Sequence, residues 1–210
     1  MRAKKKNLTD VMLKEAGLFI YGDRPGDLDV GSLDSLFLAY KQHREHKVLI
    51  REKLCNRVVK LNMDGCSKGT DECSGGGILR DHERKEIFEF NEYYSCGCIV
   101  VAELKALLGG LKICFERGYQ KIWVELDLKV VIDLVSDPGI GTWEFQEVRR
   151  ISSRMDVCYS HIYQEGNHAA GCMAYEGYYF KSKMSFEHNE LPNIVKSVVR
   201  KERYGVLTFG

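Results

Sequence analysis

The sequence predicts an α/β fold built on a five-stranded mixed sheet flanked by helices. Two observations predict this fold. Three strand-like segments joined by short turns come first, and helical and strand patterns then alternate along the chain. A strand meander followed by βα units is typical of a mixed sheet with helices on its faces. The 210 residues, of which 44% are apolar and 29% charged, suit one domain with appendages.

The first three strands are indicated by short alternating segments. Residues 59–64 alternate apolar and polar side chains and predict a half-buried strand, which Gly65 is expected to end. Residues 75–80 predict a second strand, residues 81–84 a hairpin turn, and residues 87–90 a third strand. Consecutive strands with such short connections form an antiparallel meander.

Helices and strands alternate after the meander. Residues 100–117 place apolar side chains at helical spacing, and Gly118 is expected to end that helix. The pattern then predicts, in chain order, a strand at 121–127, helices at 128–135 and 143–153, a strand at 157–163, a turn at 165–166, and a helix from its N-cap Asn167 to Phe180.

The strand order follows from the handedness of the connections. Right-handed crossovers set the fourth strand parallel to the first, which gives the order 3-2-1-4-5. The first strand is then the point where connections leave in opposite directions. Ligand sites in open α/β sheets gather near the ends of such strands.

The predicted domain occupies residues 57–180, between an N-terminal extension at 1–55 and a C-terminal tail at 181–210. Within the extension, residues 32–53 predict a helix with one apolar and one charged side. We interpret it as a solvated helix that leads into the domain; the alternative is a helix that binds a partner. The N-terminal residues and the chain past Ser182 have weak periodicity and excess charge, so we expect them to pack little against the domain.

Charge and composition exclude several classes of protein. The net charge is +1, but residues 54–180 hold 14 Lys and Arg against 19 Asp and Glu, which excludes a strongly basic nucleic-acid-binding core. No apolar stretch approaches the roughly 18 residues of a membrane-spanning helix, and none follows the basic N-terminus as in a secretory signal. We therefore expect no membrane partner, reduced cysteines, and a nuclear or cytoplasmic protein that is not secreted.

Three acidic residues stand out by their predicted positions. Asp64 lies at the end of the first strand, Asp127 at the end of the fourth, and Glu103 on the sheet-facing side of the first predicted helix. Converging carboxylates of this kind bind Mg²⁺, which suits metal-assisted hydrolysis of a phosphodiester. The alternative interpretation is two exposed strand ends and a helix acid favoured by the helix dipole.

Five short segments carry a family resemblance. They are VKLNMDG at 59–65, GGGILRD at 75–81, AELKAL at 102–107, VELDLKVV at 124–131 and HIYQEGNHAA at 161–170. With these motifs in this order, residues 57–180 resemble the ribonuclease H type 1 domains of the plant reverse-transcriptase-like group, which is related to non-LTR retroelements.

The resemblance implies the ribonuclease H-like fold and an endonuclease that hydrolyses the RNA strand of RNA–DNA hybrids. In that family four acids bind two Mg²⁺ ions, with Mn²⁺ as an alternative. Asp64, Glu103 and Asp127 match three of the four as catalytic and metal-binding residues. We also assign His168 a catalytic role near the leaving phosphate; the alternative is a surface residue at a helix N-terminus. We assign nucleic-acid contacts to the following four residues: Gly65, Ser67, Lys129 and Asn167.

The sequence departs from the family pattern at several positions. Gly171 stands where the fourth acid belongs, and neither Glu165 nor Glu176 is an obvious substitute. Residues 98–100 are Cys, Ile and Val, which cannot donate strong hydrogen bonds to RNA 2′-hydroxyls. The interval from Asp127 to Gly171 also leaves no room for the basic protrusion with which some relatives grip the hybrid.

Two functions remain open at this point. One is a ribonuclease H-like hydrolase with an incomplete four-acid site, impaired by Gly171. The other is a catalytically silent, retroelement-derived domain that binds nucleic acid or acts as an adaptor. A transposase or integrase core matches the motifs less well, and the absence of a Tyr-x-Asp-Asp motif excludes a polymerase.

Overall fold

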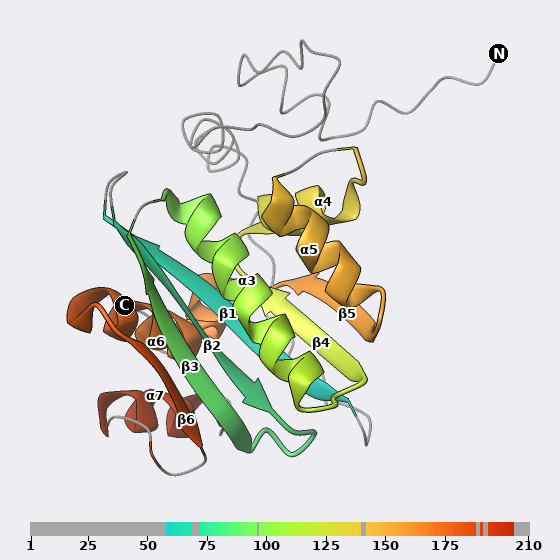
Figure 1. Cartoon of the computed structure of the whole chain (residues 1–210). Helices are drawn as coiled ribbons and strands as arrows, with labels where there is room; N and C mark the ends of the chain where they lie inside the picture. Colours follow the sequence, from blue (N-terminus) through green and yellow to red (C-terminus); the bar gives the residue numbers. More distant parts are fainter. Residues whose placement is uncertain are drawn as a thin grey trace, which may run out of the picture.

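The computed structural model describes residues 58–68, 72–95, 97–139, 142–187, 190 and 193–203. The helix predicted at 32–53, with the rest of the extension at 1–55, lies outside these residues. Within them, a single mixed sheet has helices on both faces (Figure 1). The α/β fold predicted from the sequence is therefore confirmed.

Six strands form the sheet, in the order β5-β4-β1-β2-β3-β6. Their bounds are β1 Val59–Ser67, β2 Cys73–Arg80, β3 Glu86–Tyr94, β4 Lys121–Leu126, β5 Asp156–His161 and β6 Lys183–Glu187. β1 pairs antiparallel with β2 and parallel with β4, while β2 and β3 are antiparallel and β4 and β5 parallel. The first five strands thus have the predicted order, and β6 adds an edge strand beside β3.

The helices lie in two layers. Their bounds are α3 Ile99–Glu116, α4 Lys129–Ser136, α5 Trp143–Ser152, α6 His168–Phe180 and α7 Asn193–Arg203, with a 3-10 turn at Gln164–Gly166. α3 crosses one face of the sheet with α4 and α5 beside it, and α6 and α7 lie on the other face (Figure 1). None of the helices in the described residues is long and apolar enough to cross a membrane.

A buried apolar core holds α3 against the sheet. Leu61 and Met63 of β1, Phe88 of β3, Leu107 of α3 and Phe145 of α5 are all fully buried in it. Burying a side chain of this size contributes about 1.5–3 kcal/mol. α3 ends as predicted, since Gly118 has a φ of +80°, the left-handed conformation that closes many helices. The core therefore fixes the position of every side chain on the inner face of α3.

Gly65 does not end the first strand, contrary to the prediction. β1 continues to Ser67, and Gly65 pairs with Gly75 of β2. The glycine is needed for a different reason: a Cβ at this position would lie 2.7 Å from the backbone nitrogen of Glu103. Gly65 thus allows the first turns of α3 to approach β1 closely.

The expectation that the chain past Ser182 packs little against the domain is wrong for its described part. β6 pairs with β3, and Val195, Val198 and Val199 of α7 are buried in a second core with Ile78 and Met173. The three valines recur at spacings of three and four residues, so α7 has an apolar face despite its many charges. The excess of charge along this segment concealed that face in the sequence.

Candidate active site

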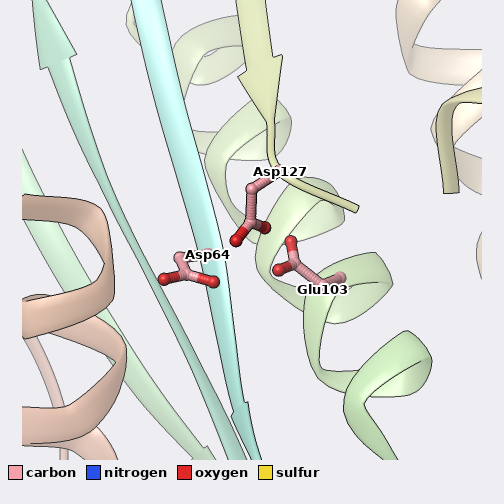
Figure 2. Close-up of side chains that lie close together, drawn as sticks. All are labelled: Asp64, Glu103 and Asp127. Atoms are coloured by element: carbon pink, nitrogen blue, oxygen red, sulfur yellow. The ribbon is translucent and has the colours of Figure 1, made fainter. Parts of the chain in front are cut away.

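Three carboxylates converge at the ends of β1 and β4. Asp64 lies on β1, Glu103 on the first turns of α3, and Asp127 directly after β4. Each offers one oxygen, and these oxygens all lie within 4.8 Å of one another. Figure 2 shows the three side chains pointing toward a common centre from three separate elements. The predicted convergence is therefore confirmed.

The register of the sheet and the approach of α3 bring these acids together. β1 and β4 are parallel, and Met63 lies opposite Leu126, so the residues that follow them, Asp64 within β1 and Asp127 after β4, lie at the same level. The His161 ring nitrogen Nε2 lies 3.0 Å from the backbone carbonyl of Asp127 and helps to hold that turn. The third acid, Glu103, arrives with α3 because of the close contact described at Gly65.

The cluster is buried, and this burial shapes its electrostatics. Asp64 is 8% exposed and Glu103 only 1%. Burial raises the pKa of Asp64 well above its usual range, and the charge of Asp127 raises it further. Burial raises the pKa of Glu103 as well, followed by the charges of Asp127 and Asp64. Acids so placed must either share protons or bind a cation.

The donor set fits a hard divalent cation. The Oε2 atom of Glu103 is buried and has no hydrogen-bond partner among the described residues. The backbone N–H of Gly65 donates to Oδ1 of Asp64 over 2.8 Å and orients this carboxylate. Carboxylate oxygens are the ligands that Mg²⁺ and Mn²⁺ prefer, and a buried oxygen without a partner is stabilised by such an ion.

Position 171 faces the cluster across from β1. A Cβ on Gly171 would lie 2.6 Å from Oδ2 of Asp64, so the Asp64 carboxylate occupies the space that a side chain at 171 needs. In the part of the chain that the structure describes, the carboxylate cluster has no fourth member. Glu165 is exposed in the turn before α6, and Glu176 lies one and a half turns further along that helix.

A cavity of about 690 Å³ opens beside the cluster. Asp64, Gly65, His168 and Gly171 contribute to its wall, together with Gln164. His168 is exposed at the first turn of α6, so its imidazole stands at the mouth of this cavity. The structure therefore brings the predicted nucleic-acid residue Gly65 and the predicted catalytic residue His168 together with the acidic cluster.

The other predicted nucleic-acid residues lie outside the cavity wall. The Ser67 hydroxyl donates to the Gly97 carbonyl over 3.4 Å, and Lys129 pairs with Asp133 at 3.1 Å. Asn167 is only 1% exposed, and its amide donates to the Met63 carbonyl over 2.6 Å. Asn167 is the N-cap residue of α6 as predicted, but its side chain joins α6 to β1 instead of capping the helix.

A buried polar network behind the site was missed in the sequence. Arg80 of β2 donates to Asn62 over 2.7 Å and to Glu202 over 2.8 Å. The other oxygen of Glu202 accepts the backbone N–H of Ala169, in the first turn of α6, over 2.9 Å. Glu202 therefore connects α7 to the start of the helix that carries His168. No spacing in the sequence indicates this network, because its members come from four separate elements.

Comparisons with known proteins agree with this geometry. Residues 62–177 match the family model described as reverse transcriptase-like. A protein of Arabidopsis thaliana that is provisionally named a ribonuclease H protein is 24% identical over 206 residues. That alignment covers 92% of this chain but 31% of the relative, so the chain spans about a third of the length of this relative.

Solved structures show the fold. The N-terminal ribonuclease H domain of rv2228c from Mycobacterium tuberculosis superposes with a TM-score of 0.55 at 19% identity, over 60% of this chain and 96% of that one. LC11-RNase H1, solved in complex with an RNA/DNA hybrid, superposes with a TM-score of 0.53 at 18% identity, over 59% of this chain and 98% of that one. With a family match over more than half of its length, this chain belongs to the reverse transcriptase-like family and contains a ribonuclease H-like domain.

Proposed function

We propose that the domain is a divalent-metal-dependent endonuclease that hydrolyses the RNA strand of RNA–DNA hybrids, at a rate limited by Gly171. The observation that carries this proposal is the cluster of Asp64, Glu103 and Asp127 at the β1 and β4 ends of a ribonuclease H-like sheet. The names of the relatives support the substrate class, since one of them was solved with an RNA/DNA hybrid.

The three carboxylates would hold Mg²⁺ or Mn²⁺. Such an ion lowers the pKa of bound water and stabilises the charge that develops on phosphate oxygens. β1 and the core under α3 fix the backbones of Asp64 and Glu103, so both carboxylates are presented to the ion from rigid elements. Gly65 and His168 both line the cavity beside the cluster, where a nucleic-acid strand would contact the β1 backbone and His168 would hold a proton near the leaving group.

The second candidate function is a catalytically silent domain that binds nucleic acid. The geometry at Gly171 favours it, because that position supplies no ligand and Asp64 extends into the space instead. A site with three acids binds an ion less tightly than one with four. In this case the domain would retain the hybrid-binding surface and lose the hydrolysis.

A cleavage assay on an end-labelled RNA–DNA hybrid tests the two functions. We expect slow cleavage that depends on Mg²⁺ or Mn²⁺ and disappears in Asp127→Asn. The matched control is Asp156→Asn, which makes the same change at an aspartate whose side chain is 75% exposed outside the cluster. Cleavage by Asp127→Asn at the native rate would contradict the proposal. Binding of the hybrid with no cleavage in either ion would instead support the silent domain.

A further inference from the structure

Three aromatic side chains form an exposed patch on α6. Tyr175, Tyr179 and Phe180 are 48%, 67% and 61% exposed. The rings of Tyr175 and Tyr179 are nearly parallel, with centroids 6.2 Å apart, and Phe180 meets Tyr179 edge to face at 5.0 Å. Large apolar surfaces of this kind are uncommon on a soluble domain unless something binds there. We call these three residues the aromatic patch.

The aromatic patch is continuous with the candidate active site. All three of its side chains line the cavity of about 690 Å³ that Asp64 and Gly171 also line. α6 carries Gly171 and Tyr175 one turn apart, so the patch extends the cavity wall along the helix. A strand bound at the carboxylates can therefore reach the rings without crossing another element.

A lysine places positive charge over the patch. The Lys68 ammonium lies 5.4 Å from the centroid of the Tyr175 ring and 5.3 Å from that of Tyr178. Among the described residues Lys68 forms no ion pair, so its charge is available to a phosphate. Glu176 lies on the same wall of α6 beside the rings, so the bases of a bound strand, and not its phosphates, should face the helix.

We propose that the aromatic patch stacks the unpaired bases of a single-stranded nucleic-acid segment beside the acidic cluster. Aromatic rings bind bases through their π faces, and only unpaired bases offer those faces to a protein. Lys68 would pair with the backbone of the same segment. This proposal rests on the proposed function for its partner class, and it deepens that function: the preferred ligand is a hybrid that continues into a single strand.

A protein partner explains the patch less well. It would have to bury the charges of Lys68 and Glu176 beside the apolar rings, and desolvating charged groups opposes binding. A single strand leaves both charges in water while its bases cover the rings. A second copy of the chain on the patch is measurable, because in the absence of nucleic acid only self-association would change the mass of the particle.

Fluorescence anisotropy without divalent ions, which prevents cleavage, tests the proposal. The probes are a blunt RNA–DNA hybrid and the same hybrid with a single-stranded RNA extension. We expect the extension to tighten binding at least about fivefold, as one stacked base would. The double variant Tyr179→Ala with Phe180→Ala should lose this gain and bind the blunt hybrid as before. Trp143→Ala, an aromatic residue that is 62% exposed outside the cavity, is the matched control and should change nothing.

Further outcomes separate this proposal from the proposed function. Tyr179→Leu keeps an apolar side chain but no ring, so it too should lose the gain if stacking is the cause. An extension that does not tighten binding to the native chain would overturn the proposal. The proposal would also be overturned if light scattering showed that the native chain is a dimer and that the double variant is a monomer. If the single-stranded RNA binds through the patch and the blunt hybrid does not bind at all, the proposed function fails and the patch stands.

Discussion

At position 171 the lack of a side chain leaves the space that the Asp64 carboxylate occupies. The Asp64 carboxylate lies where a Cβ at 171 would need to be, at 2.6 Å. An acid introduced there must first turn this carboxylate away. The atoms that such a Cβ would meet are Oδ2 and Cγ of the Asp64 side chain and no backbone atom of β1, so a turn of this side chain makes the room. A new ligand at 171 is therefore compatible with the backbone of both elements.

We expect Gly171→Asp to raise the rate of hybrid cleavage by at least about tenfold, which corresponds to about 1.4 kcal/mol of barrier. The physical reason is a fourth carboxylate for the ions. Gly171→Asn is the control, because it adds nearly the same bulk without the charge and should slow or abolish cleavage. Rates measured on the labelled hybrid check both. Equal rates in the Asp and Asn variants would show that charge at 171 plays no part.

Glu89 on β3 is a buried acid that the candidate site does not use. It is fully buried, and neither carboxylate oxygen has a hydrogen-bond partner among the described residues. Its pKa is raised from 4.5 to about 7, chiefly by burial and also by the charge of Glu86, while the charge of Arg80 opposes the rise. A raised pKa means that the folded state favours the protonated carboxyl. The free energy of unfolding therefore decreases as the pH rises from about 4.5 through 7.

We expect Glu89→Gln to remove most of this loss. The variant should match the native chain near pH 4 and exceed it at pH 8, by an amount on the order of 1–3 kcal/mol. The buried amide of glutamine also lacks partners, so the gain should fall short of the full effect of the charge. Urea unfolding at a series of pH values measures the difference. A difference that is constant with pH would exclude ionisation of Glu89 as its cause.

Among the elements, α7 supports α6. The carboxylate of Glu202 accepts a hydrogen bond from the Ala169 N–H and pairs with Arg80, and both charged side chains are less than 10% exposed. An acid at the start of a helix also interacts favourably with the helix dipole. Because α6 carries His168 and Gly171, the C-terminal segment helps to fix one side of the candidate site. We propose that the domain extends to residue 203, beyond the predicted boundary at 180.

We expect Glu202→Ala to cost about 3–5 kcal/mol of stability, because it leaves the Arg80 charge buried without its partner. Hydrogen exchange at the Ala169 amide should accelerate more than exchange in β1. Adding Arg80→Met to Glu202→Leu should restore much of the stability, since neither charge remains to be buried. The control is Glu187→Gln, which removes an exposed ion pair with Arg117 and should cost less than about 1 kcal/mol. An equal loss in both single variants would contradict the role of burial.

On the scale of the whole molecule, the sequence predicted what depends on local pattern. Strand alternation and the crossover rule were sufficient for the order 3-2-1-4-5, and that order placed Asp64 beside Asp127. Hydrogen bonds and ion pairs between segments that lie far apart in the sequence could not be predicted in this way. Glu202 and Arg80 lie 122 residues apart, and neither shows a pattern that indicates the other. The role of Gly65 was also missed, because a glycine in a strand predicts a break as readily as a close contact.

The acidic cluster also affects the stability of the whole domain. Burial and mutual repulsion raise the pKa of Glu103, so this carboxyl costs the fold stability at pH values above the ordinary glutamate range. Because the pKa of Glu103 is higher in the folded state than in the unfolded state, the free energy of unfolding decreases as the pH rises from the ordinary glutamate range through the raised pKa. A bound divalent cation would reverse the effect, because an ion that binds only the folded state stabilises it by mass action.

We therefore expect Glu103→Gln to change stability in opposite directions with and without metal. In EDTA at pH 7 the variant should melt at a higher temperature than the native chain, because glutamine neither takes up a proton on folding nor holds a buried charge. Added Mn²⁺ should raise the melting temperature of the native chain and leave that of Glu103→Gln nearly unchanged.

Thermal melts followed by circular dichroism measure the native chain and the variant, each with and without Mn²⁺. The control is Glu147→Gln on α5, which should respond to Mn²⁺ like the native chain. If Mn²⁺ stabilises Glu103→Gln as strongly as the native chain, the ion binds elsewhere. The three carboxylates would then be a buried acidic cluster and not a metal site.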